Sequence, residues 1–330
     1  MGSNKLHGVI IVTYRCNARC NMCDVWHYPS KANEEIGLAV LEKLPNLYYL
    51  NITGGEPFIR QDLPEIVRLM RKKARRIVIS TNGYFTDRIV ALCKEFPEVG
   101  IRISIEGLPK TNDAIRQIPD GFDRGLRTLL ELRALGLKDI GFGMTVQDLN
   151  AKDLVPLYHL GKALDYEFAT ATLHNSHYFH KLDNIIRDKA AVNEEFKRLI
   201  RELLRSKKPK EWFRAYFNLG LMNYIEGKPR MLACEMGQDG FFVDPAGDVL
   251  PCNGMTEKQS MGNLHEQSWE QIWNSDRAKE VRGLVKACGK NCWMMGSAAP
   301  AILSHPVKPL TWVFKNKLRL LVGKDVCFHE

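Results

Sequence analysis

Over roughly its first two thirds, the chain alternates short apolar runs with stretches whose apolar residues recur every three to four positions. The apolar runs are rich in Val and Ile and are bounded by turn residues, as buried strands are. They predict six strands, at residues 9–13, 48–53, 76–80, 100–105, 140–146 and 168–173. The amphipathic stretches between them predict helices at residues 38–43, 63–73, 86–95, 122–135 and 154–164.

Strands that alternate with helices are typical of a parallel sheet covered by helices. Six such units are fewer than the eight of a closed barrel. The predicted fold class is therefore α/β, with a partial (β/α)6 TIM-like barrel. In such folds the functional groups gather on the loops that follow the carboxyl ends of the strands, so the residues on these loops are the candidates for function.

The pattern changes after about residue 192. Two helical stretches, at 192–206 and 211–226, lead into an apparent hairpin in which Phe241–Val243 and Val249–Leu250 flank the turn sequence Asp-Pro-Ala-Gly-Asp. We therefore predict a barrel over residues 1–208 and a small C-terminal α+β domain with a tail over residues 209–330.

Composition and charge exclude several classes of protein. A hydrophobic content of 45% with 26% charged residues is that of a globular chain and not of a disordered one. The first apolar run is too short for a signal peptide or a membrane span, so a cytoplasmic protein is expected. The net charge of +9 comes from scattered residues without aromatic interleaving, so nucleic acid is not expected as a partner. The basic, amphipathic tail at 310–321 is expected to pack on the body, with binding to a membrane surface as the alternative.

Nine cysteines are many for such a chain, and their clustering in a reducing compartment points to metal binding or catalysis. Cys16, Cys20 and Cys23 follow the first predicted strand directly. No fourth cysteine lies nearby, so a metal held by these three thiolates would keep an open coordination position, as a catalytic site needs. The alternative is a zinc knuckle that also uses His27.

The run from Tyr14 to Cys23 resembles the signature of the radical S-adenosylmethionine superfamily, with Met22 in place of the usual aromatic residue. The resemblance implies a 4Fe–4S cluster on Cys16, Cys20 and Cys23 whose open iron chelates S-adenosylmethionine. Reductive cleavage of that molecule would give a 5′-deoxyadenosyl radical, which takes a hydrogen atom from a substrate. In such enzymes the cofactors carry the chemistry and the protein positions them.

Further motifs at strand ends resemble those that hold S-adenosylmethionine in this superfamily. The second strand ends in a Gly-Gly-Glu-Pro motif, the third in Ser-Thr-Asn-Gly and the fourth in Ser-Ile-Glu-Gly, where relatives often have Asp in place of Glu. The cofactor-binding residues that the resemblance implies are Gly54, Gly55, Glu56, Pro57, Ser80, Asn82, Ser104, Glu106 and Arg116.

Four C-terminal cysteines form two pairs: Cys234 with Cys252, and Cys288 with Cys292. Four thiolates make a closed site that suits zinc and an iron–sulfur cluster about equally. The spacing Cys234-x12-Gly247-x4-Cys252 resembles the twitch domain, a shorter relative of the SPASM domain. The resemblance implies one auxiliary 4Fe–4S cluster, and thus two clusters in all. Cys327 would replace a ligand or stay free, and Cys93 is expected in the core.

The expected function is hydrogen abstraction from an organic substrate, leading to net oxidation or bond formation. A small molecule or carbohydrate is preferred because no peptide-binding module precedes Cys16; a peptide-modifying enzyme and an epimerase are the alternatives. An electron donor such as flavodoxin or ferredoxin is implied. His174 or His177, which follow the sixth strand, are expected to contact substrate. A zinc-stabilised protein that binds nucleic acid or membrane, without catalysis, is the alternative of another class.

Overall fold

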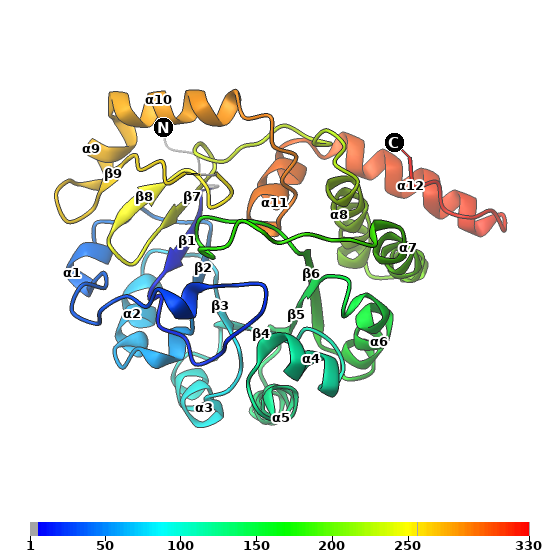
Figure 1. Ribbon diagram of the computed structural model, residues 1–330, viewed down its shortest axis with the longest axis horizontal. Coiled ribbons are helices and arrows are strands. Elements are labelled where there is room, and N and C mark those ends of the chain that lie inside the picture. Colours follow the sequence, from blue (N-terminus) through cyan, green and yellow to red (C-terminus); the bar gives the residue numbers. More distant parts are fainter. Residues whose placement is uncertain (1–5, 256, 330) are drawn as a thin grey trace.

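The computed structural model describes residues 6–255 and 257–329. The six predicted strands are present and run parallel, in the order β6-β5-β4-β3-β2-β1. Their bounds are β1 His7–Ile11, β2 Tyr49–Thr53, β3 Ile77–Thr81, β4 Gly100–Ser104, β5 Ile140–Val146 and β6 Glu167–Thr172. The sheet curves around an interior without closing, so the predicted partial barrel is confirmed (Figure 1).

The same sheet continues into the C-terminal part of the chain. β7 (Gly240–Val243) pairs in parallel with β1, and the predicted hairpin to β8 (Asp248–Leu250) is present, followed by the short β9 (Gly262–Asn263). The result is a nine-stranded sheet. The sequence predicted the hairpin but not its attachment to the first strand, because the two segments are more than 200 residues apart. The C-terminal cysteines therefore belong to segments built directly onto the barrel.

The helices predicted between the strands are present and cover the outside of the sheet (Figure 1). Those of the barrel are α1 Leu38–Leu41, α2 Leu63–Met70, α3 Thr86–Glu95, α4 Pro109–Arg116, α5 Gly121–Ala134 and α6 Leu154–Ala163. Those that follow are α7 Lys189–Arg205, α8 Pro209–Ile225, α9 Trp269–Asn274, α10 Asp276–Lys286, α11 Met295–Ser304 and α12 Val307–Leu321. Single 3₁₀ turns lie at Val25–His27, Pro57–Ile59 and Ala151–Asp153. α4, which is largely polar, and α9, α10 and α11 were not predicted.

Apolar side chains of the strands and of the helices that cover them form the core. This core is continuous from the barrel into the C-terminal part. Ile10, Ile52, Ile79 and Ile101 are fully buried in it. α8 packs against β6, and α11 packs against β1 and β7, so these two helices lie where the barrel is open (Figure 1). The edge of the sheet at which the strands end is left for the loops that carry the cysteines.

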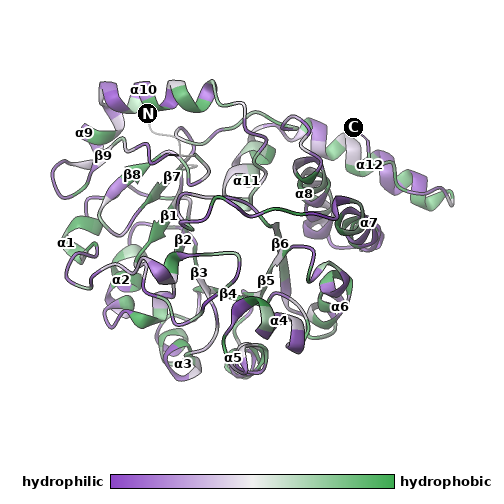
Figure 2. Ribbon diagram, in the orientation of Figure 1, coloured by the Kyte–Doolittle hydropathy of each residue, from purple (hydrophilic) through white to green (hydrophobic). Residues whose placement is uncertain are grey.

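The tail forms α12, which packs on α7 and α8 as expected. Trp312 and Val313 are buried in that contact, whereas Leu310 and Phe314 are exposed. Hydrophobic and hydrophilic residues alternate along α12 (Figure 2). Among the described residues, no helix is both long and apolar enough to cross a bilayer.

Candidate active site

The three N-terminal cysteines lie on one loop at the carboxyl end of β1. The backbone N–H of Arg19 donates to the carbonyl of Arg116, and that of Asn21 to the carbonyl of Ile115. The N–H of Asp24 donates to Phe179, in the segment after β6. The loop is therefore tied to the end of α4 and to the far side of the barrel mouth, which brings Cys16, Cys20 and Cys23 over the interior.

Glycines of the Gly-Gly-Glu-Pro motif make room for this loop. The N–H of Gly55 donates to the carbonyl of Thr13 at 2.8 Å, and that of Glu56 to Arg15 at 2.9 Å. A Cβ on Gly54 would lie 2.5 Å from the Thr13 oxygen, and one on Gly55 2.3 Å from the Arg15 oxygen. Only glycine fits such a close backbone approach. In the structure both glycines lie against the start of the cysteine loop, and their contact with the cosubstrate stays a prediction.

The carboxylate of Glu56 is fully buried and joins two motifs. It accepts hydrogen bonds from the hydroxyl of Thr81 (2.7 Å), the N–H of Asn82 (2.7 Å) and the N–H of Phe58 (3.1 Å). Burial raises its pKa. These three donors fix the position of the carboxylate, and its predicted contact with the ammonium group of the cosubstrate stays a prediction. The side-chain amide of Asn82 in turn donates to Asn17 on the cysteine loop, at 2.7 Å.

Arg116 places a positive charge beside the cysteine loop. Its guanidinium lies 2.8 Å from the buried carboxylate of Glu106, whose other oxygen accepts from the N–H of Thr145. Burial alone would lower the pKa of Arg116, but the neighbouring Cys20 and Glu106 raise it. Burial also raises the pKa values of the Cys16 and Cys23 thiols to about 12, an effect that Arg116 opposes. The charge therefore favours the thiolate forms that metal ligands need.

Two buried donors near the loop have no partner among the described residues: Nδ2 of Asn17 and Nε of Arg116. Buried donors are rarely left unpaired in native proteins. Both fit a bound group rich in acceptors, such as the sulfides of an iron–sulfur cluster or the carboxylate of S-adenosylmethionine. No group of three His, Cys, Asp or Glu side chains in the described part of the chain is drawn together closely enough for a single metal ion.

The remaining predicted residues lie at the same edge of the barrel but with fewer contacts. Pro57 begins the 3₁₀ turn after the glycines. The hydroxyl of Ser80 accepts from the side chain of Asn51 inside the barrel, at 3.0 Å. Ser104 is half-buried at the end of β4. Their contacts with a cosubstrate stay predictions.

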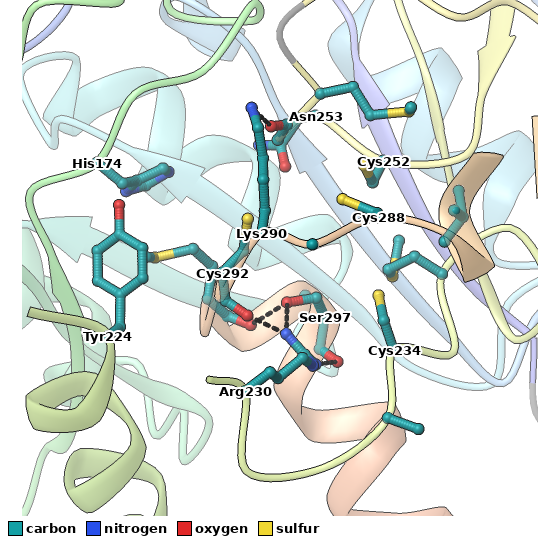
Figure 3. Close-up of a pocket in the computed structure, with 18 of the residues that line it drawn as sticks. His174, Tyr224, Arg230, Cys234, Cys252, Asn253, Cys288, Lys290, Cys292 and Ser297 are labelled. Atoms are coloured by element: carbon teal, nitrogen blue, oxygen red, sulfur yellow. Dashed lines mark hydrogen bonds between the residues drawn. The ribbon is translucent and has the colours of Figure 1, made fainter. Parts of the chain in front are cut away.

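The four C-terminal cysteines come together, as their spacing predicts. Cys234, Cys252, Cys288 and Cys292 line one cavity of about 580 Å³ (Figure 3). Burial, with smaller contributions from the nearby Cys234 and Cys292, raises the pKa of Cys252 to about 11. Cys327 is not among the lining residues.

Two long side chains, Arg230 and Trp293, fasten the segment that carries Cys292. Arg230 donates to the carbonyls of Cys292, Leu232 and Ser297 (Figure 3). The indole N–H of Trp293 donates to the carbonyl of Phe217 in α8, and its ring lies against Gly220. Neither Arg230 nor Trp293 was predicted from the sequence. Their signal was only proximity to cysteines, because their partners are far away in the chain.

His174, one of the two predicted substrate contacts, lines the same cavity together with Tyr224 (Figure 3). Nδ1 of His174 is 2.9 Å from the carbonyl of Thr172, so this nitrogen carries the proton and Nε2 is an acceptor. Burial lowers the pKa of His174, which keeps the ring neutral. His177 does not line this cavity.

The loop after β6 also connects the two groups of cysteines. The hydroxyl of Tyr178 donates to the carbonyl of Gly54 at 2.5 Å. The hydroxyl of Ser176 donates to the carbonyl of Asn253, next to Cys252, at 2.7 Å. The glycine motif and the C-terminal cavity are thus held by residues only two positions apart. Tyr178 was not predicted, because its role depends on a partner 124 residues away.

Comparisons with known proteins agree with this arrangement. Residues 10–161 match the profile of the Radical SAM superfamily, and residues 234–293 match SPASM, an iron–sulfur cluster-binding domain. The chain belongs to the radical SAM superfamily. The radical SAM domain implies S-adenosylmethionine and a 4Fe–4S cluster, and the SPASM domain implies additional iron–sulfur cluster binding. The predicted cofactors are therefore confirmed. The alternative of a zinc-stabilised binding protein without catalysis is not supported.

The similar proteins include a synthase, a maturation protein and a solved structure with a bound peptide. Fe-coproporphyrin III synthase of Methanosarcina barkeri is 34% identical over 159 residues, which is 45% of this chain and 39% of that protein. The sporulation killing factor maturation protein SkfB of Bacillus subtilis is 24% identical over 315 residues, 90% of this chain and 70% of that one. The structure of Streptococcus suis SuiB bound to the precursor peptide SuiA has a TM-score of 0.63 at 17% identity, covering 88% of this chain and 72% of SuiB. That last likeness is one of fold.

Proposed function

We propose that this radical SAM enzyme carries out a net oxidation or bond formation at a C–H bond of a peptide. The observation that carries the proposal is the placement of a four-cysteine cavity beside the barrel mouth, joined to the three-cysteine loop through the segment after β6. Of the similar proteins, the one aligned over 90% of the chain is a maturation protein, and SuiB shares the fold with a peptide bound. These similarities support a peptide better than the small molecule or carbohydrate that the sequence analysis preferred.

At the barrel mouth, Cys16, Cys20 and Cys23 would hold the first cluster. When bound, the cluster and S-adenosylmethionine supply the one-electron chemistry that removes a hydrogen atom from a substrate C–H bond. Gly54 and Gly55 let the cysteine loop sit against the end of β2. Arg116, paired with Glu106, provides a buried positive charge next to the thiolates.

At the C-terminal cavity, Cys234, Cys252, Cys288 and Cys292 would hold an auxiliary cluster. Four thiolates make a closed site, so we assign it to structure or electron transfer and not to binding S-adenosylmethionine. The acceptor Nε2 of His174 faces the same cavity, where it can accept a hydrogen bond or a proton from substrate.

The remaining cysteines favour oxidation over epimerisation. An epimerase needs a spare thiol at the barrel mouth to return a hydrogen atom. Cys93 is buried in α3, and Cys327 is held at α12 by Asn316 and Trp312. Neither of them lines the cavity. For the reaction in deuterated water, we expect a product two hydrogens lighter, unchanged in Cys327→Ala. A product of unchanged mass with one deuteron, lost in that variant, would replace oxidation by epimerisation.

The substrate class can be tested without knowing the substrate. An extract of the source organism grown on deuterated medium is divided, and one half is digested with peptidases. Each half is incubated with the anaerobically reconstituted, reduced enzyme, and deuterium in 5′-deoxyadenosine is measured. We expect transfer from the undigested half and its loss after digestion. Equal transfer from both halves would favour a small molecule, such as the tetrapyrrole named in the M. barkeri relative.

A further inference from the structure

The helix α12 has apolar residues on two opposite faces. With 100° between successive residues, Pro309, Trp312, Val313 and Leu320 form one face, which packs on the body. Another set of large side chains follows at intervals of three and four residues on the opposite side. Their exposed fractions are 76% for Val307, 65% for Leu310, 67% for Phe314, 47% for Leu318 and 80% for Leu321. We call this set the outer stripe.

The outer stripe is the most concentrated exposure of large apolar side chains in the described residues. Val322 (69%) and Leu303 (55%), at its two ends, extend it further. The other exposed large apolar residues are scattered over the barrel helices and loops, as is normal for a soluble surface. A continuous exposed stripe of this kind marks an interaction surface.

Cationic residues follow one border of the outer stripe. By the same 100° spacing these are Lys308, Lys315 and Arg319, whereas Lys317, at the other border, donates to the carbonyls of Leu204 and Ser206 in the body. Lys308 and Lys315 are exposed. Between residues 307 and 324 the chain has no Asp or Glu. Apolar residues flanked by cations, without acidic residues, match the apolar interior and anionic headgroups of a bilayer surface.

We propose that the outer stripe of α12 docks the protein onto an anionic membrane surface, lying in the plane of the interface. The charge pattern argues against a second copy of the chain as occupant. Two copies related by a two-fold axis would bring the same face together, and with it two rows of cations and no anion. The other face of α12 packs on α7 and α8, so the outer stripe faces away from the body of the protein. This proposal does not depend on the substrate of the enzyme.

The test is co-sedimentation of the reconstituted full chain with vesicles. One set contains phosphatidylcholine alone and the other equal parts of phosphatidylcholine and phosphatidylglycerol. We expect binding to the anionic set to be at least about tenfold tighter, and to weaken with added salt. Leu310→Ser with Phe314→Ser should weaken it by about tenfold or more. Lys315→Gln should weaken it by about fivefold and only for the anionic vesicles.

The matched control is Leu130→Ser with Leu135→Ser, two exposed leucines on and just after α5, which should bind like the unchanged protein. All variants change exposed side chains, so iron content and cleavage of S-adenosylmethionine should stay as they were, which checks that they fold. Absence of binding to anionic vesicles, or binding unchanged by the stripe substitutions, would refute the proposal. A dimer in light scattering that dissociates in Phe314→Ser would refute it in favour of self-association.

Discussion

The two groups of cysteines are held in different ways. The N-terminal loop is fixed by backbone hydrogen bonds to Gly55 and Glu56 and by the close approach of two glycines. The C-terminal segments are fixed by long side chains, chiefly Arg230 and Trp293, which reach back to carbonyls on other elements. The N-terminal loop has no room for an added atom at the two glycines. The C-terminal segments instead depend on the presence of the two long side chains. The tight backbone packing suits the N-terminal site, which must present an open metal position accurately. The side-chain support suits the C-terminal site, which is closed by its own four ligands.

Addition of one methyl group at the N-terminal site should have the largest effect. In Gly55→Ala the new Cβ would lie 2.3 Å from the Arg15 carbonyl, so the cysteine loop must move. We expect reductive cleavage of S-adenosylmethionine to fall by at least about 100-fold, with loss of the N-terminal cluster's iron. The control is Gly283→Ala, where no atom lies within 4 Å of the added Cβ. Equal activity of the two variants would contradict the packing argument.

Removal of the charge beside that site should cost stability as well as activity. Arg116→Met leaves the carboxylate of Glu106 buried without its partner, which typically destabilises a protein by about 3–5 kcal/mol. Addition of Glu106→Gln should recover much of that loss in urea unfolding, while cleavage of S-adenosylmethionine stays impaired. Full recovery of cleavage in the double variant would show that the charge serves only to neutralise Glu106.

Loss of a side chain should damage the C-terminal site alone. Arg230→Met removes donors from three carbonyls around Cys292, so we expect iron and sulfide to fall by about half. Uncoupled cleavage of S-adenosylmethionine should remain. Arg277→Met, at an exposed arginine that binds Ser260 and Gln259, is the matched control. Unchanged iron in Arg230→Met would mean that the cysteines hold their cluster without this support.

The smallest effect should come from the segment that links the two sites. Tyr178→Phe removes a single hydrogen bond to the Gly54 carbonyl, worth about 1 kcal/mol. We expect about a fivefold slower cleavage of S-adenosylmethionine and full iron content. A complete loss of activity with iron retained would point to a chemical role for the phenol and would require a new account of this residue.

The same contrast explains what the sequence could predict. The six strands, the hairpin and both cysteine groups have local signals, namely period, turn residues and short spacing. The close approach of Gly55 to the Arg15 carbonyl was not predicted, because a sequence does not show which backbone segments come close. Arg230, Tyr178 and the pairing of β7 with β1 depend on partners far away in the chain. Tyr178 and the strand pairing have no local signal, and the only one for Arg230 is its nearness to Cys234.

The central claim is that this radical SAM enzyme has two cluster sites with separate tasks. It is tested most directly by comparing two variants for iron, sulfide and cleavage of S-adenosylmethionine after anaerobic reconstitution. The first variant carries Cys16→Ala, Cys20→Ala and Cys23→Ala, and the second Cys252→Ala. We predict that each loses about half of the iron, that the first loses all reductive cleavage, and that the second keeps uncoupled cleavage while losing substrate turnover. Reductive cleavage retained in the triple variant, or full iron in Cys252→Ala, would contradict the account.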